Sequence, residues 1–472
     1  MAPLSPIEDT RLLAEPTAAL VARMQQAGPR YTSYPTAVEF HDGIDAAAYG
    51  ARLDAASQNA DTPLALYAHF PFCEQRCHFC ACHMIATKRR DRTEPYIERL
   101  IREIDLVADR LGDRNRISQL HWGGGTPTYF DAEHLVAVMN GIRRRFTLTP
   151  DAEVSLEVDP RVTSREQLAA LAGVGFNRVS MGVQDLDPQV QTAIGRVQPF
   201  EMTESLVADA RDLGYRSVNV DLVYGLPHQT VDNFDRTLDR VLELQPDRVA
   251  VYGFAYVPWH KGTQRRIDPA TLPGADARID LLLLTRRRFL ELGYVEIGID
   301  HFARPDDDLA IARSKRELHR NFMGYTTSLA PDMVGVGVSS IGEVAGAFVQ
   351  NSTKLAHWER SIDAGELPTV RGYALTADDH IRRALILDLM CHFSIDRRAL
   401  ERTFDIDFAT YFAADLARLA PLVDDGLVEI DDDEVRVTPL GHLFTRNVAM
   451  AFDAHLQAKR AAKDGPRFSS TV

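Results

Sequence analysis

Between residues 64 and 256, short apolar stretches alternate with longer amphipathic ones. Six stretches have the length and composition of buried strands: 64–70, 117–122, 153–158, 178–183, 217–224 and 248–256. The segments between them have the apolar spacing of helices: 93–111, 132–145, 164–172, 200–213 and 231–244. Strands that alternate with helices are typical of a parallel sheet. Six strands fall short of the eight that close a TIM barrel, so we predict an open, partial (β/α)6 barrel.

The segments on either side of this region follow other patterns. Residues 1–60 contain a helical stretch at 17–26 and then the peptide 29–35, whose prolines cannot lie inside a helix. This peptide either packs on the barrel as a strap or covers the active site as a lid. After one more helix at 275–292 comes a loop-rich stretch; helices follow at 377–393 and 408–419, and a hairpin at 427–437. We therefore expect an N-terminal extension (1–60), a partial barrel (61–350) and a mostly helical C-terminal domain that covers the active site (351–472).

Length and composition exclude several classes of protein. A chain of 472 residues is too long for one hydrophobic core, which supports this division. The formal net charge of −14 argues against a nucleic-acid partner, although the C-terminal pattern resembles a winged helix in outline. The sequence has no apolar run of about 18 residues that could span a membrane. Residues 1–17 lack the basic and apolar regions of a signal peptide, so we expect a cytoplasmic protein.

Four of the five cysteines lie within ten residues, at Cys73, Cys77, Cys80 and Cys82. A disulfide framework is excluded because the chain is long, otherwise poor in cysteine and without an export signal. Structural zinc usually takes two separate pairs of ligands, and no second Cys pair exists, although three histidines are near in sequence: His69, His78 and His83. Three thiolates spaced Cys-x3-Cys-x2-Cys on one loop favour a [4Fe–4S] cluster with one iron open to an exchangeable ligand. This spacing resembles that of radical S-adenosylmethionine (SAM) enzymes. The fifth cysteine, Cys391, lies on the apolar face of a predicted helix, and we expect it to be a core residue.

Glycine and polar residues fall at the ends of the predicted strands. The run 123–126 ends the second strand, Glu157 the third, Gln184 the fourth and Ala255 the sixth, while Asp221 lies near the end of the fifth. Because the carboxyl ends of parallel strands meet at one rim, these residues and the cysteine loop predict an active site there. The glycines let the backbone present N–H groups to a carboxylate or C=O groups to an ammonium. Phe79 either packs beside an adenosyl group or anchors the loop.

Eight stretches resemble the oxygen-independent coproporphyrinogen III oxidases, a radical SAM family. They are PRYTSYPT (29–36), HFPFCEQRCHFCAC (69–82), QLHWGGGTPT (119–128), LEVDPR (156–161), FNRVSMGVQD (176–185), DLVYGLPHQT (221–230), DHFARPDD (300–307) and HRNFMGYTT (319–327). The resemblance implies a [4Fe–4S] cluster bound by Cys73, Cys77 and Cys80. It implies one SAM in contact with Tyr67, Gly124, Glu157 and Ile341, and a second SAM in contact with Phe79, Gly125, Thr126, Gln184, Arg196, Asp221 and Ala255. Cys82 is a candidate catalytic residue whose role stays open between structure and assistance to the substrate.

The resemblance also implies the reaction. A one-electron donor such as flavodoxin or ferredoxin reduces the cluster, and SAM is split into methionine and a 5′-deoxyadenosyl radical. The radical takes hydrogen from a propionate of coproporphyrinogen III, which loses CO2 and an electron to leave a vinyl group. Two propionates react, giving protoporphyrinogen IX, and we expect a monomeric enzyme. The alternatives are a haem-binding chaperone, a haem-modifying relative, and an iron–sulfur electron carrier that does not cleave SAM. The 29–36 block, Cys82 and the C-terminal domain favour the oxidase.

Overall fold

The computed structural model describes residues 14–328, 330–462 and 468–471, so residues 1–13 of the predicted N-terminal extension lie outside the described ranges. The fold is organised around a curved sheet with the strand order β16-β15-β14-β13-β1-β4-β5-β6-β7-β8-β10-β9. The six predicted strands form its centre and pair in parallel. They are β1 (Leu64–Phe70), β4 (Arg116–Gly124), β5 (Thr147–Val158), β6 (Arg178–Gln184), β7 (Ser217–Tyr224) and β8 (Arg248–Gly253). The sheet stays open, because β16 and β9 at its two ends do not pair with each other.

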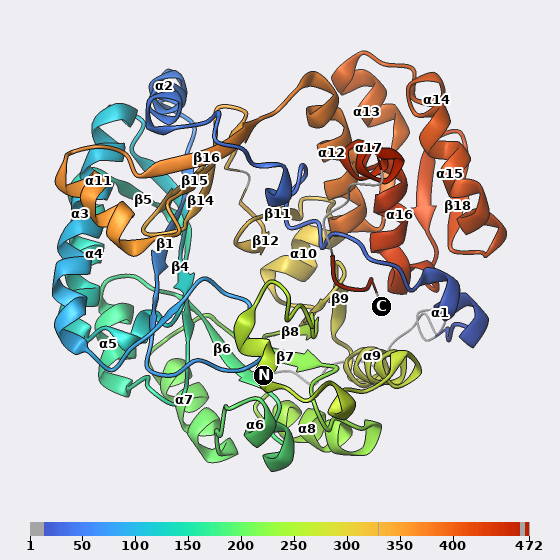
Figure 1. The fold of residues 1–472 in the computed structure, drawn as a ribbon, viewed down its shortest axis with the longest axis horizontal. Coiled ribbons are helices and arrows are strands. Elements are labelled where there is room, and N and C mark those ends of the chain that lie inside the picture. Colours follow the sequence, from blue (N-terminus) through green and yellow to red (C-terminus); the bar gives the residue numbers. More distant parts are fainter. Residues whose placement is uncertain (1–13, 329, 463–467, 472) are drawn as a thin grey trace.

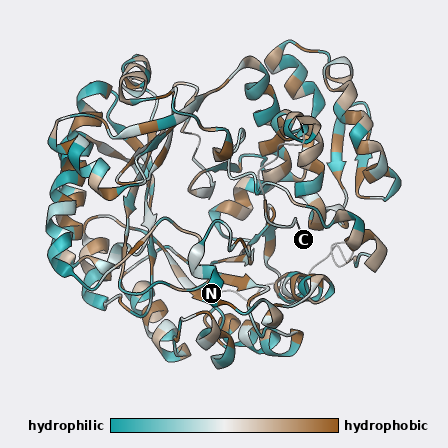
Figure 2. Cartoon of the chain, in the orientation of Figure 1, coloured by the Kyte–Doolittle hydropathy of each residue, from teal (hydrophilic) through white to brown (hydrophobic). Residues whose placement is uncertain are grey.

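Helices follow the strands as predicted and cover the outer face of the sheet, at the left and bottom of Figure 1. They are α3 (Thr93–Leu111), α4 (Ala132–Arg145), α5 (Arg165–Gly173), α6 (Pro188–Ala193), α7 (Phe200–Asp212), α8 (Val231–Glu243) and α9 (Ala275–Glu291). The short α6 was not predicted. These helices carry hydrophobic and hydrophilic residues on different faces (Figure 2). The apolar face of α3, for example, buries Ile97, Leu100 and Ile104.

Strict alternation along the strands determines which side chains reach the inside of the barrel. On β5, Val154 and Leu156 are buried under the helices, while Ser155 and Glu157 line the interior cavity. Successive side chains of a strand point to opposite faces of the sheet. The apolar residues of β5 therefore pack in the hydrophobic core, while the polar residues between them face the interior cavity.

Residues 293–374 contain more strands than the sequence predicts. Beyond β8 lie β10 (His301–Ala303) and β9 (Val295–Ile297), both antiparallel to their neighbours. On the other side of the sheet β13 (Met333–Val336) pairs in parallel with β1, and three strands continue from it: β14 (Ile341–Val344), β15 (Ala347–Asn351) and β16 (Thr369–Ala374). The sheet thus extends past residue 350, and the division of the chain at that residue stays a prediction.

Smaller elements complete this part of the chain. They are α1 (Ala18–Met24), α2 (Ala46–Ala56), β2 (Phe72–Cys73), β3 (Ile85–Ala86), α10 (Asp308–Ser314), β11 (His319–Asn321), β12 (Gly324–Thr326) and α11 (Leu355–Asp363). None of the helices in the described ranges is long and apolar enough to cross a membrane.

The C-terminal part is helical with one small sheet, at the upper right of Figure 1. Its helices are α12 (Ala377–His392), α13 (Arg397–Phe404), α14 (Phe408–Tyr411), α15 (Ala413–Asp424), α16 (Thr445–Phe452) and α17 (Ala454–Ala462). The predicted hairpin is present as β18 (Val428–Ile430) and β19 (Glu434–Val437), and β17 (Ser394–Asp396) adds a third strand. Cys391 is buried in a hydrophobic cluster, as expected of a core thiol.

The peptide 29–35, called the strap below, packs mainly against this C-terminal part. Tyr31 and Tyr34 are fully buried in its hydrophobic core. The hydroxyl of Tyr31 donates to a carboxylate oxygen of Asp453, at 2.9 Å. Between these anchors and the barrel, Arg30 donates to the carbonyl oxygen of Gly253 at the end of β8. The strap therefore connects the C-terminal helices to the rim of the barrel.

Candidate active site

The loop that carries the cysteines is fixed at its base. Two short parallel strands, β2 and β3, close it, and the N–H of Ile85 donates to the carbonyl of Pro71 at 2.7 Å. Its middle is attached to the segment after α6, because the N–H of His78 donates to the carbonyl of Ile194 at 2.8 Å. The loop therefore holds its sulfur atoms at the carboxyl end of β1, where the sequence predicts the active site.

Two arginines approach the sulfur of Cys77. A guanidinium nitrogen of Arg161 lies 3.6 Å from Sγ and one of Arg196 lies 3.7 Å from it. Asp159 pairs with both arginines, at 2.6 and 3.0 Å. The two N–H groups direct positive charge at a sulfur that carries negative charge as a thiolate, and hydrogen bonds to ligand sulfurs tune iron–sulfur clusters. From the sequence, Asp159 was placed at the predicted rim without a role and Arg161 was not singled out, although both lie in the stretch LEVDPR.

The other three cysteines differ in their surroundings. Cys73 Sγ lies 3.3 Å from the hydroxyl of Thr126, and burial raises the pKa of this thiol to about 12. Cys82 is exposed and hydrogen-bonds to Cys80, a contact that lowers the pKa of Cys80 and raises that of Cys82. In the described parts of the chain, no three His, Cys, Asp or Glu side chains are placed to hold a single metal ion. The ligands of a cluster, in contrast, are distributed over several irons.

The glycine run is packed too closely for side chains. A Cβ on Gly125 would lie 2.7 Å from the backbone of Pro71, and Gly124 has a φ of +111°. The N–H of Gly124 donates to Glu157 at 3.1 Å, that of Gly125 to the carbonyl of Phe70 at 2.7 Å, and that of Thr126 to the carbonyl of Phe72 at 3.0 Å. Since these N–H groups already have acceptors within the protein, the run is suited to offer C=O groups to an ammonium rather than N–H groups to a carboxylate.

Three of the expected contacts to the first SAM lie side by side on β1, β4 and β5. Glu157 accepts from Gly124 and lies 3.6 Å from Nε2 of His121. Burial alone would raise the pKa of Glu157, but the contacts with His121 and with the N–H of Gly124 bring it below its ordinary value. Tyr67 stacks on His121, with ring centroids 6.1 Å apart, and its hydroxyl hydrogen-bonds with His69 at 2.9 Å. The structure thus brings Tyr67, Gly124 and Glu157 together around an ionised carboxylate.

The fourth expected contact, Ile341, reaches the same place from a distant part of the chain. It begins β14, and its carbonyl packs against Gly335, the β13 partner of Tyr67 in the sheet register. The turn before it, residues 337–340, is held by Glu103 of α3. One oxygen of Glu103 accepts from the N–H of Gly337 and from Nε1 of Trp358, both at 2.8 Å. Glu103 was not predicted; the available signal is an acidic residue on the otherwise apolar face of α3.

Five of the seven residues expected at the second SAM form two groups, and the other two, Gly125 and Thr126, lie in the glycine run. Gln184, at a left-handed φ of +71°, and Arg196 both border Gly182, whose carbonyl accepts from Arg196 at 2.6 Å. Gly182 is opposite Asp221 in the register of β6 and β7. Asp221 lies three residues before the end of β7, and burial, together with the charge of Glu157, raises its pKa to about 6. A non-glycine residue in the left-handed region is strained, and such strain clusters at functional sites.

The second group consists of Phe79 and Ala255. Gln264, which is fully buried, donates to the carbonyl oxygens of both residues, each at 3.0 Å. The prediction that Ala255 ends the sixth strand is wrong: β8 ends at Gly253, and Ala255 lies in the loop that follows. The last hydrogen bond between β7 and β8 joins the N–H of Phe254 to the carbonyl of Tyr224, at 2.8 Å. Gln264 was missed because, in sequence, it is one polar residue in a basic loop.

Comparisons with known proteins agree with this geometry. A model of the radical SAM superfamily matches residues 67–241, and a model of the HemN C-terminal domain matches residues 375–444. The chain is 44% identical over 441 residues to the oxygen-independent coproporphyrinogen III oxidases of Salmonella typhimurium and of Escherichia coli, which covers 93% of this chain and 96% of each relative. The solved structure of coproporphyrinogen III oxidase (HemN) from Escherichia coli, described as a radical SAM enzyme, superposes with a TM-score of 0.87 at 43% identity and covers 90% of this chain and 98% of that one.

Proposed function

The chain belongs to the oxygen-independent coproporphyrinogen III oxidases, and from this membership we propose that it converts coproporphyrinogen III to protoporphyrinogen IX by oxidative decarboxylation of two propionates. The observation that carries the proposal is the identity of 44% across 93% of the chain, which includes both the barrel and the C-terminal domain. The protein is a radical SAM enzyme that uses a [4Fe–4S] cluster and SAM. This favours the oxidase over a haem-binding chaperone or a haem-modifying relative.

We propose that Cys73, Cys77 and Cys80 hold the cluster. The residues present fit it: three soft sulfur ligands share one anchored loop, and Arg161 and Arg196 direct N–H groups at Cys77. When bound, the cluster and SAM supply the 5′-deoxyadenosyl radical that removes a hydrogen atom from the substrate propionate. Cys82, in contact with Cys80, lies beside this ligand set, and its role stays a prediction.

The carboxylates at the strand ends are proposed to orient SAM. Glu157 is ionised near neutral pH, because its pKa is lowered, and it suits an ammonium or a pair of ribose hydroxyls. Tyr67 and Ile341 add apolar surface around it. The group of Gln184, Arg196 and Asp221 is the proposed place for a second SAM, together with Phe79, Gly125, Thr126 and Ala255. These assignments follow from the family and from the closeness of the side chains in each group.

The electron donor is proposed to be a flavodoxin or ferredoxin. Cationic side chains are exposed beside the cysteine loop in a chain whose net charge is −14: Arg76, Lys88, Arg92 and Arg89, the last of which pairs with Asp91 at 2.7 Å. A local basic surface on an acidic protein favours approach of an acidic electron carrier.

The function is tested by anaerobic incubation of the cluster-loaded protein with SAM, a reductant and coproporphyrinogen III, followed by mass analysis of the tetrapyrroles. Loss of two carboxyl groups, with 5′-deoxyadenosine and methionine formed alongside, is the expected result. Formation of 5′-deoxyadenosine with no decarboxylated product would contradict the proposed substrate. A sample that binds the tetrapyrrole and forms neither product would contradict the enzymatic function itself.

A further inference from the structure

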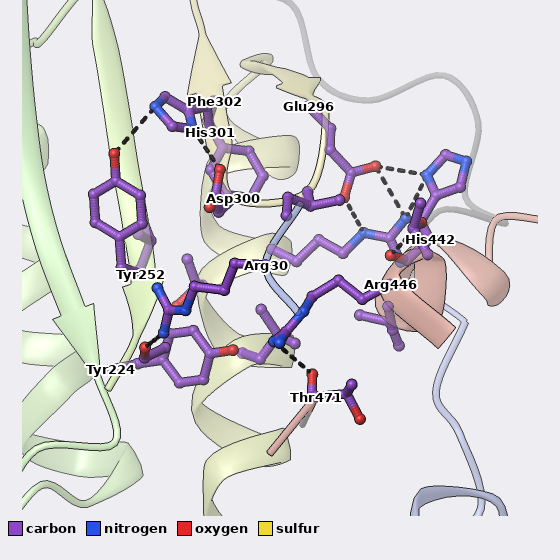
Figure 3. Close-up of a pocket in the computed structure, with 18 of the residues that line it drawn as sticks. Arg30, Tyr224, Tyr252, Glu296, Asp300, His301, Phe302, His442, Arg446 and Thr471 are labelled. Carbon is purple, nitrogen blue, oxygen red and sulfur yellow. Dashed lines mark hydrogen bonds and ion pairs between the residues drawn. The ribbon is translucent and has the colours of Figure 1, made fainter. Parts of the chain in front are cut away.

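A second cavity opens where β7 and β8 end against α9, α16 and the strap (Figure 3). Five arginines line it, and three of them come from separate parts of the molecule: Arg30 of the strap, Arg278 of α9 and Arg446 of α16. In Figure 3, Arg30 and Arg446 extend into the cavity near Tyr224. The cavity therefore exists only where the N-terminal strap, the barrel and the C-terminal helices meet.

Among the residues that the structure describes, no acidic side chain forms an ion pair with these three arginines. Arg30 donates to the carbonyl of Gly253, Arg278 to that of Phe254 at 3.1 Å, and Arg446 to those of Gly28 and Pro29 at 2.7 and 2.9 Å. Within the described ranges, none of the three has a carboxylate oxygen within 4.0 Å. Nε of Arg278 is buried and has no hydrogen-bond partner among the described residues. These cations are held in place by backbone carbonyls, and the charge of Asp300 acts on Arg30 and Arg446 without forming an ion pair with either.

Other cationic side chains in the lining of the same cavity do form ion pairs with carboxylates. Arg286 pairs with Glu296 at 3.0 Å, and Glu296 also contacts His442 at 2.7 Å. Asp300, the remaining carboxylate in the lining, hydrogen-bonds with the neighbouring His301 at 2.6 Å. Among the arginines without acidic partners, burial and the charge of Arg30 lower the pKa of Arg446 to about 10. The same two causes lower the pKa of Arg278. Confined like charges of this kind are stabilised by an anion that accepts from several of them at once.

The cavity adjoins the proposed active site. Tyr252 and His301 line it, and they also line the interior cavity that contains Glu157 and Asp221. The strand end contacted by Arg30 is followed directly by the loop of Ala255, the proposed SAM contact. A ligand with several side chains can therefore place one side chain in the barrel while another contacts the arginines.

We propose that Arg30, Arg278 and Arg446 form a carboxylate-binding site for those propionates of the substrate that are not being decarboxylated. This inference rests on the proposed function, because the substrate is a tetrapyrrole with carboxylate side chains. Guanidinium groups bind carboxylates through paired N–H donors, and three of them from three parts of the fold can accommodate more than one propionate. A bound substrate would then fix the strap and the C-terminal helices against the barrel.

The test compares variants by fluorescence titration with coproporphyrin III, the stable oxidised form of the substrate, and with its tetramethyl ester. Arg278→Gln is expected to weaken binding of the free acid about 10- to 100-fold, since a hydrogen bond to a charged group contributes about 1.5–3 kcal/mol. Arg278→Lys should recover part of that loss. The matched control is Arg287→Gln on the same helix, whose side chain is half exposed and pairs with Glu15 outside the cavity. Arg287→Gln should bind coproporphyrin III with the same affinity as the unmodified protein. The tetramethyl ester should bind all of these proteins with equal affinity. Arg30→Gln on the strap gives a second variant if Arg278→Gln does not fold.

The outcomes separate this proposal from the proposed function. Equal affinity of the unmodified protein, Arg278→Gln and Arg30→Gln for coproporphyrin III would overturn the carboxylate site, even if the enzyme turns over coproporphyrinogen III normally. Weakened binding of SAM with unchanged binding of coproporphyrin III would also overturn it, because the arginines would then hold the carboxylate of SAM. A third outcome is that the protein binds the free acid through these arginines but never decarboxylates coproporphyrinogen III. That outcome would support the carboxylate site and contradict the proposed function.

Discussion

Glu103 is predicted to control both the stability of the barrel and the position of the turn 337–340. The perturbation is Glu103→Leu, which keeps the size of the side chain and removes its oxygens. The N–H of Gly337 and Nε1 of Trp358 lose their acceptor, while Nδ2 of Asn351, 2.6 Å from the other oxygen of Glu103, still donates to the carbonyl of Gly337. Two buried donors without partners cost about 1–3 kcal/mol each, so a loss of about 2–6 kcal/mol is expected while the carboxyl is protonated.

The same residue gives the loss a pH dependence. Burial raises the pKa of Glu103 from 4.5 to about 7. A carboxyl whose pKa is raised by folding binds more protons in the folded state, so the folded state becomes less stable as the pH rises from about 4.5 to about 7. A shift of about 2.5 pKa units corresponds to about 3.4 kcal/mol. Since leucine lacks this ionisation, the deficit of Glu103→Leu should shrink by about 2.5 kcal/mol between about pH 5 and about pH 8.

Urea unfolding at the two pH values measures the deficit, and titration with SAM measures the effect on the turn that precedes Ile341. The exposed Glu98 on the same helix provides the control Glu98→Leu, for which neither quantity should change. A deficit that grows with pH would refute the reasoning. It would mean that the three N–H donors around Glu103 stabilise the ionised form by more than burial destabilises it.

Three further predictions concern the ligand set, the SAM site and an ion pair. Cys77→Ala should lose bound iron and sulfide and all turnover, whereas Cys391→Ala should keep the cluster; iron retained in Cys77→Ala would disprove the ligand assignment. Glu157→Gln should bind SAM about 10- to 100-fold more weakly in calorimetry of the cluster-loaded protein, because one charged hydrogen-bond acceptor is lost, and unchanged affinity would remove Glu157 from the site. His455 lies 2.7 Å from Asp379, which raises the pKa of His455, so the protonated pair stabilises the fold at pH values below about 6.5 and this contribution is lost as the pH rises through the raised pKa. His455→Gln should therefore lower the free energy of unfolding by about 1 kcal/mol near pH 6 and by less near pH 8, and an equal loss at both would contradict the pairing.

The six central strands could be predicted because each is a short stretch rich in apolar residues, continuous or alternating with polar ones, that lies between helical stretches. The strands between residues 293 and 374 could not, because most have only three to five residues and are defined by their partners. β13, for example, has four residues and forms a strand because β1, more than 260 residues earlier, offers it a parallel edge. A local pattern of hydrophobic residues does not indicate a pairing partner that is so distant in sequence.

Some residues of the candidate site could likewise be predicted from the sequence and others could not. Residues on strand ends, such as Glu157 and Gln184, could be placed from topology alone, because parallel strands bring their carboxyl ends to one rim. Glu103 and Gln264 could not, since each acts on a segment at least 180 residues away in sequence. Arg30 is a further case. It lies within the quoted stretch PRYTSYPT, but the cavity that it enters depends on how the N-terminal and C-terminal parts of the chain meet.

The strap has a consequence for the order in which the molecule can be assembled. During synthesis its residues leave the ribosome before those of the barrel, yet much of the surface that buries Tyr31 and Tyr34 is made by residues that emerge hundreds of positions later. Ala27 likewise bridges to Ser470. Contacts between segments so distant in the chain form late, because the intervening chain must already be compact. The barrel can thus fold around its own core before the arginine-lined cavity exists. The cavity forms in a late step of folding, when the strap packs against the C-terminal helices.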